Sequence, residues 1–130
     1  MERDFREGEV WTFRDAPLPE SRVVIGKVDA HERLDQVFSV SIKTVPLPTG
    51  ATGEIRVSDI SHVPVTKSVL DASLLEQVGA GEPSESFAEG YGQWREAFDA
   101  GKAGVFTIEI SKVVEVINQT WSKGTPVARS

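Results

Sequence analysis

Strand-type patterns occupy the first half of this chain, whereas helix-type patterns are confined to the second half. Residues 9–14, 22–29 and 36–45 are rich in β-branched and aromatic residues, which is typical of strands. Apolar residues at helical spacing begin only after residue 66. This order is typical of α+β domains and not of alternating βαβ units. We therefore predict an α+β fold in which a curled N-terminal antiparallel sheet is packed by two to three helices from the C-terminal half.

Residues 36–45 give the clearest strand signal in the chain. Strict alternation puts Phe38, Val40 and Ile42 on one face of the strand, and Thr44 continues that face. Phe38, Val40 and Ile42 are therefore expected to face the core.

Gly26 lies inside the second predicted strand, which favours a bulge or the close approach of another backbone at this point. Strands curled at this glycine can form an open meander, and an SH3-like partial barrel is the alternative. Residues 46–53 contain two prolines and two glycines, and we predict a loop there. Residues 55–65 are predicted to form one or two short strands.

The first predicted helix begins at Thr66 or Ser68, either of which is a suitable N-cap. Its apolar stripe at helical spacing consists of Leu70, Leu74, Leu75 and Val78. The glycines and the proline of residues 79–83 are predicted to end this helix.

A second helix is predicted from Ser86, because Ser86 and Glu89 have the spacing of a capping box. Four aromatic residues then follow on one helical face, namely Phe87, Tyr91, Trp94 and Phe98. Gly101 suits the C-terminal cap. We expect the two helices to cover the core face of the sheet, with the four rings against it and the carboxylates in water.

Residues 104–110 are predicted as a last strand that joins the sheet or pairs at its edge. Ser111 is expected to cap a short final helix that runs to residue 118. The inner face of this helix is predicted to consist of Val113, Val114 and Ile117.

The chain has 130 residues, a length that suits one domain. We predict a single domain over residues 1–122 and a flexible tail over residues 123–130, which lack periodicity. No run of apolar residues is long enough for a transmembrane helix, and residues 1–4 do not resemble a secretory signal. A cytoplasmic protein without a membrane partner is therefore expected.

The net charge is −6, and it is concentrated in the middle of the chain. Residues 46–101 carry three basic and nine acidic side chains. A nucleic acid is not an expected partner, because its phosphates would be repelled by this acidic field. The acidic surface either keeps the protein in solution or docks a basic partner.

Few residues have the chemistry of a catalytic or metal site. There is no cysteine and no G-x-S-x-G motif, and no catalytic residue, metal or cofactor is predicted. His31 stands among carboxylates in residues 29–35, where a solvated turn is expected rather than a metal site. His62 is interpreted as a histidine bonded to backbone, with a general base or a pH-sensitive contact as the alternative.

The aromatic stripe of the second helix is the strongest candidate for a functional surface. Gly90 and Gly92 each cost about 1 kcal/mol inside a helix, so the close approach of another backbone or of a ligand should compensate. The candidate residues for binding a ligand or partner are His62, Tyr91, Trp94, Arg95 and Glu96. Arg95 and Glu96 are expected to form a charged pair at the rim.

Two segments resemble a group of small bacterial proteins that have no assigned activity. They are His-Val-Pro-Val at residues 62–65 with Leu-Asp-Ala-Ser at 70–73, and FAEGYGQWREAF at 87–98 with GKAGVFTI at 101–108. The resemblance implies a bacterial and cytoplasmic protein. It brings no catalytic residue with it.

Three hypotheses for function follow. The first is a non-catalytic protein-interaction module whose acidic helical surface binds an unknown protein or a second copy of the chain. The second is a small-molecule-binding domain or small enzyme, with a pocket between the sheet and the helix at residues 86–100. The third is an inhibitor or immunity-type protein that blocks a basic partner.

Overall fold

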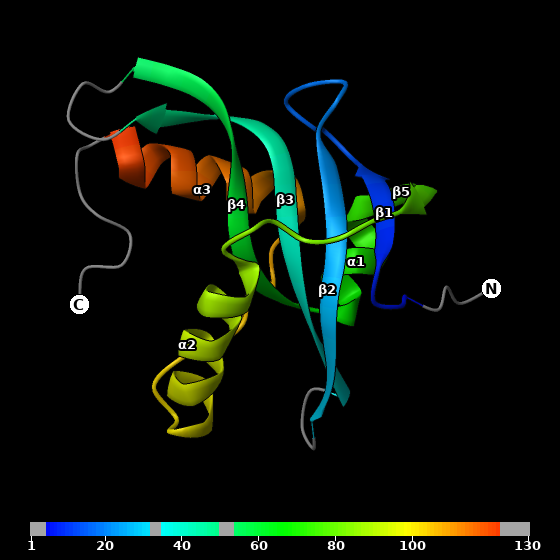
Figure 1. The fold of residues 1–130 in the computed structure, drawn as a ribbon, viewed down its shortest axis with the longest axis vertical. Coiled ribbons are helices and arrows are strands. Elements are labelled where there is room, and N and C mark those ends of the chain that lie inside the picture. Colours follow the sequence, from blue (N-terminus) through cyan, green and yellow to red (C-terminus); the bar gives the residue numbers. More distant parts are fainter. Residues whose placement is uncertain (1–4, 32–34, 50–53, 123–130) are drawn as a thin grey trace.

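The computed structural model describes residues 5–31, 35–49 and 54–122. Its elements are β1 (Glu9–Phe13), β2 (Arg22–His31), β3 (Asp35–Thr49), β4 (Glu54–Thr66), α1 (Lys67–Ser73), β5 (Leu74–Ala80), α2 (Phe87–Asp99) and α3 (Ile110–Ser122). The predicted α+β fold is confirmed (Figure 1). In the part of the chain that is described, no helix combines the length and the apolar character needed to cross a membrane.

The strands form one open sheet in the order β4-β3-β2-β1-β5, and every neighbouring pair is antiparallel. The first three strands form the predicted meander, and β4 extends it by pairing with β3. The sheet does not close into a partial barrel, because β4 and β5 lie at opposite edges. Residues 55–65 belong to one long strand, β4. The predicted strand at 104–110 is reduced to a single parallel bridge between Phe106 and Val65.

Bulges decide which side chains of β3 face the core. Phe38, Val40 and Ile42 are buried in it as predicted, but the core face then passes to Val45. The register between β3 and β4 shifts between Ile42 and Val45, and Thr44 in that gap has a φ of 62°. Simple alternation, which puts Thr44 on the same side of the strand as Ile42, therefore fails beyond Ile42, because it assumes a strand without bulges.

The predicted loop at 46–53 is wrong over residues 46–49, which continue β3, while residues 50–53 lie outside the described residues. Beyond Lys43, β3 is no longer paired with β2 and has β4 as its neighbour. Prolines are tolerated in such an edge position because no second strand needs their missing N–H. The carbonyl oxygen of Pro46 instead accepts a hydrogen bond from Asn118 Nδ2 at 3.0 Å.

The first predicted helix is also partly wrong, since α1 ends at Ser73 and Leu74–Ala80 form strand β5. β5 pairs with β1, and this non-local pairing overrides the helical spacing of its leucines. Leu74 is buried, whereas Leu75 and Val78 are exposed. Thr66 occupies the N-cap position of α1 but makes no side-chain capping hydrogen bond.

The helices lie on both faces of the sheet (Figure 1). One face carries the hydrophobic core, to which α1 and α3 contribute Val69, Leu70, Ile110, Val113, Val114 and Ile117. The predicted inner face of the last helix is confirmed, although α3 begins at Ile110 rather than after a Ser111 cap. α2 lies against the opposite face, so the prediction that it covers the core face as part of a helical pair is wrong.

Candidate functional site

Phe87 packs the first turn of α2 against the face of the sheet opposite the hydrophobic core, called the outer face below. Its ring lies directly over Gly26, where a Cβ atom would overlap it. The register of β2 also shifts between Ile25 and Lys27, so Gly26 is the bulge that the sequence indicated. The close approach is made by an aromatic ring rather than by a backbone, and it leaves Phe87 7% exposed.

Gly90 brings the next turn of α2 against β4. A Cβ atom on Gly90 would lie 3.1 Å from the Cβ of His62, so only glycine lets the helix lie this close without displacement. His62 is in a stretch of β4 where the register with β3 shifts, between the partners of Val40 and Ile42. Such a bulge re-aims a side chain, and here it accompanies the contact of the imidazole with α2.

The imidazole of His62 is enclosed by aromatic rings. Its centroid lies 5.5 Å from that of Phe87, 5.9 Å from that of Tyr91 and 5.4 Å from that of Trp94. Burial lowers the pKa of His62 from 6.5 to about 4, so the ring is neutral near pH 7. The ring-bearing side of α2 therefore lies on the sheet as predicted, and Phe98 continues the stripe by stacking on Trp94.

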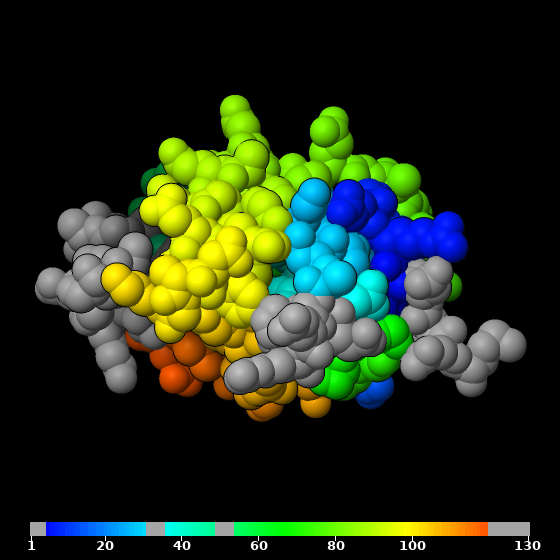
Figure 2. All heavy atoms as spheres, turned by 90° about the horizontal axis from the view of Figure 1, so that it is seen from below, coloured from blue at the N-terminus to red at the C-terminus, as the bar shows by residue number. Residues whose placement is uncertain are grey.

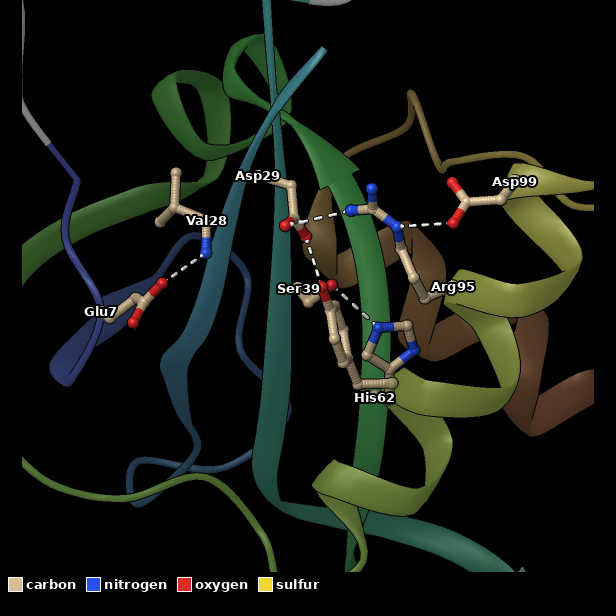
Figure 3. Close-up of polar contacts among 8 residues, drawn as sticks. Glu7, Val28, Asp29, Ser39, His62, Arg95 and Asp99 are labelled. Atoms are coloured by element: carbon tan, nitrogen blue, oxygen red, sulfur yellow. Dashed lines mark hydrogen bonds and ion pairs between the residues drawn. The ribbon is translucent and has the colours of Figure 1, made fainter.

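His62 Nε2 lies 2.9 Å from Ser39 Oγ, within reach of a hydrogen bond (Figure 3). A neutral histidine beside a serine hydroxyl is the geometry of a base and its nucleophile. However, Ser39 is 0% exposed, so no substrate atom can approach its hydroxyl. The pair therefore supports packing between β3 and β4, and the partner of His62 is a side chain rather than the expected backbone.

Further along α2, Tyr91 and Arg95 converge on Asp29 of β2, and Figure 3 shows Arg95 between Asp29 and Asp99. The Tyr91 hydroxyl donates to Asp29 Oδ2 at 2.9 Å, and Arg95 Nη1 lies 3.1 Å from Asp29 Oδ1. Arg95 Nε donates to Asp99 Oδ2 at 3.1 Å. Desolvation and the hydrogen bond to Asp29 raise the pKa of Tyr91, while the hydrogen bond to Asp99 raises the pKa of Arg95.

The structure brings four of the five predicted binding residues together. His62, Tyr91 and Trp94 are in ring contact, and Arg95 joins them through Asp29. Glu96 stays apart, since the ion pairs of Arg95 in the described chain are with Asp29 and Asp99. Sequence reasoning missed Asp29, Asp99 and Ser39. The i, i+4 spacing of Arg95 and Asp99 was the one available signal, because the other contacts are non-local.

A cleft of about 340 Å³ opens where the C-terminal end of α2 meets β2 and β3. Its walls include Asp29, Val37, Trp94, Arg95, Phe98 and Asp99. The rings of Trp94 and Phe98 stack with centroids 4.7 Å apart, and Trp94 Nε1 donates to the Gly104 carbonyl at 2.9 Å. His62 and Tyr91 do not line this cleft, which differs from the pocket lining expected from the sequence.

Residues 81–86, called the strap below, cross the outer face of the sheet before α2 (Figure 1). Gly81 N donates to the Gly8 carbonyl at 2.8 Å, and Ser84 N donates to Ser41 Oγ at 3.0 Å. Ser84 Oγ donates in turn to Asp59 Oδ2 at 3.1 Å. The strap is therefore hydrogen-bonded to the segment before β1 and to strands β3 and β4.

The strap and α2 present an acidic surface, and Figure 2 shows the two as one continuous body of yellow-green and yellow atoms. Four exposed carboxylates belong to it, namely Glu82, Glu85, Glu89 and Glu96. None of the four makes an ion pair or a hydrogen bond through its side chain within the described chain. Ser86 is the N-cap residue as predicted, but the capping-box hydrogen bond is not formed.

Within the described ranges, no three His, Cys, Asp or Glu side chains come together as metal ligands do. The interpretation of His31 and the predicted tail at 123–130 concern side chains and residues outside those described. Comparisons with protein-family models, with curated proteins and with solved structures found no significant match to this chain.

Proposed function

We propose that this protein is a non-catalytic protein-interaction module that binds a basic partner through the strap and the solvent side of α2. The observation that carries the proposal is the set of four exposed carboxylates without ion pairs on an anchored segment. Bacterial origin and a cytoplasmic location belong to the same proposal, and they rest on the resemblance described above.

The charge arrangement supports a role in association. Carboxylates without intramolecular partners leave their field uncompensated, and such a field steers an oppositely charged protein toward the surface. The strap is hydrogen-bonded at Gly81 and Ser84, so little conformational entropy is lost when it binds. Ser39 and His62, which resemble a nucleophile and its base, give a substrate no access because Ser39 is 0% exposed.

The test compares two neutralised variants that have the same net charge. The first replaces Glu82, Glu85, Glu89 and Glu96 by Gln, and the control replaces Glu20, Glu54, Glu76 and Glu115 by Gln on other parts of the surface. The probe is a twelve-residue lysine peptide, and its binding at low salt is measured by titration calorimetry. We expect the first variant to lose about tenfold or more in affinity and the control to lose less than threefold. Equal losses in both variants would overturn the proposal.

A small-molecule-binding domain is a second candidate, and the cleft beside Trp94 is the observation that favours it. A screen of small amines and carboxylic acids by thermal shift would test it, with stabilisation lost in Trp94→Ala as the expected result. An inhibitor or immunity-type protein would use the same acidic face as the interaction module. Inhibition of a basic enzyme by the wild type, but not by the neutralised variant, would identify that case.

A further inference from the structure

The cleft at the end of α2 has two kinds of wall. One wall is aromatic, made by the stacked rings of Trp94 and Phe98. The other is charged, made by Asp29, Arg95 and Asp99. The indole is held in place by its hydrogen bond to Gly104, so the aromatic wall is preorganised.

The charged wall carries a net charge of −1, because one guanidinium lies between two carboxylates. Asp29 is 16% exposed and is already bound by Tyr91 and Arg95. Asp99 is 59% exposed and contacts Arg95 through Oδ2 only, so its Oδ1 is open to a further donor. The available group in the cleft is therefore a hydrogen-bond acceptor with negative charge.

This combination selects against anions. An incoming carboxylate or phosphate would face Asp29 and Asp99, whereas Arg95, the one cation among the described residues that line the cleft, is already paired with both. A cation on a long side chain, in contrast, gains the Asp99 carboxylate, and its alkyl part gains contact with Trp94 and Phe98. Because the cleft adjoins α2 at the end of the acidic surface, a basic protein docked there would bring cationic side chains to its mouth.

We propose that this cleft receives a single lysine or arginine side chain of the basic partner, with its alkyl part against Trp94 and Phe98 and its charge at Asp99. The proposal rests on the function proposed above and adds a specificity site to it. A long flexible chain with a terminal cation suits a cleft of about 340 Å³ that is apolar on one side and acidic on the other.

The probe is the peptide acetyl-Gly-Gly-Lys-Gly-Gly-amide, and the control is the same peptide with Nε-acetyl-lysine. The readout is the NMR signal of the Trp94 indole N–H, which is one of three indoles and is assigned with Trp94→Phe. We expect the lysine peptide to shift this signal on titration and the acetylated peptide to leave it unchanged. Equal shifts with both peptides would overturn the proposal.

The variant Asp99→Asn tests the negative charge of Asp99 separately from its structural contact with Arg95. Asparagine keeps an oxygen that can accept from Arg95 Nε, and loss of a negative charge near a helix C-terminus does not disfavour the helix. We expect it to weaken binding of the lysine peptide about fivefold. The matched control is Glu76→Gln, which removes one exposed charge of β5 outside the cleft and the acidic surface and should weaken binding less than twofold.

The two proposals fail in different ways. If the twelve-residue lysine peptide binds through the acidic surface but Asp99→Asn has no effect on either peptide, the cleft proposal is wrong and the interaction module stands. If the single-lysine peptide shifts Trp94 and depends on Asp99, while neutralising the four glutamates changes nothing, the cleft binds cations without the proposed docking surface. If neither peptide binds, both proposals are overturned.

Discussion

His62 has the environment of a structural residue. Its ring lies among Phe87, Tyr91 and Trp94, and Ser39 lies within hydrogen-bond distance. A charged imidazole would lose hydration in this setting, which is the reason that its pKa falls to about 4. Because burial of the His62 ring itself disfavours its charged form, protonation of this residue is coupled to the stability of the fold.

We predict that His62 makes the fold less stable as the pH falls from about 6.5 to about 4. In this interval the unfolded chain binds the proton and the folded chain does not, so stability is lost on acidification and levels off below the folded pKa. Partial exposure of the ring limits the effect to about 1–2 kcal/mol. Urea unfolding across this pH range should show a shallower pH dependence in His62→Gln, and identical slopes would contradict the prediction.

At the scale of elements, α2 is held by a few close contacts rather than by a continuous apolar stripe. Phe87 is its one buried residue, while Tyr91 and Arg95 contact β2 through polar bonds. Phe87 can pack on β2 in this position because Gly26 has no Cβ atom. Gly92, in the same helix as Gly90, has nothing within 4 Å of where a Cβ would lie.

Two glycine substitutions should therefore have opposite effects. Gly26→Ala places a methyl group in the ring of Phe87 and should destabilise the fold by about 1–3 kcal/mol. Gly92→Ala meets open space in a helix and should stabilise it by about 1 kcal/mol. Chemical denaturation of both variants measures the two changes. If Gly26→Ala leaves the free energy of unfolding unchanged, α2 is not packed on β2 in this way.

For the whole molecule, the two faces of the sheet differ in how much apolar surface they bury. α1 and α3 cover a core that runs from Phe5 to Ile117, whereas the strap and α2 close the other face mainly through Phe87, rings and hydrogen bonds. Local stability follows buried apolar contact. The proposed binding surface thus lies on the less deeply packed layer, while the core layer maintains the sheet.

Hydrogen exchange should reveal this difference. We expect the backbone amides of α2 to exchange at least tenfold faster than those in the middle of α3, because four apolar side chains are buried among the described residues of α3 and one in α2. Mass spectrometry of peptides from the two helices, under conditions that keep the protein folded, would measure this. Equal protection of both helices would mean that the sheet and all its helices open as one unit.

Local patterns in the sequence were sufficient for features that depend on near neighbours. They predicted β1 and β2 closely, the first part of β3, the start of α2, its aromatic face, the inner face of α3 and the bulge at Gly26. These predictions succeed because the spacing of apolar residues and the residue types at turns show that a segment has one apolar side. The same patterns led to Tyr91, Trp94 and Arg95 as candidate residues, since they are aromatic or ionisable and close to the helix glycines in sequence. His62 was a candidate because it is an ionisable residue in a predicted strand region.

Only the tertiary structure decided which surfaces meet. Periodicity does not say which face of a sheet receives a helix, so α2 was assigned to the wrong one. Leu74 became a strand residue because β1 had an unpaired edge, and no local signal contains that information. Asp29 meets Arg95 across 66 positions of sequence because Gly26, Gly90 and the bulge in β4 let α2 lie against the sheet. Contacts of this kind arise from chain topology and close packing, and they determine the cleft and its charge.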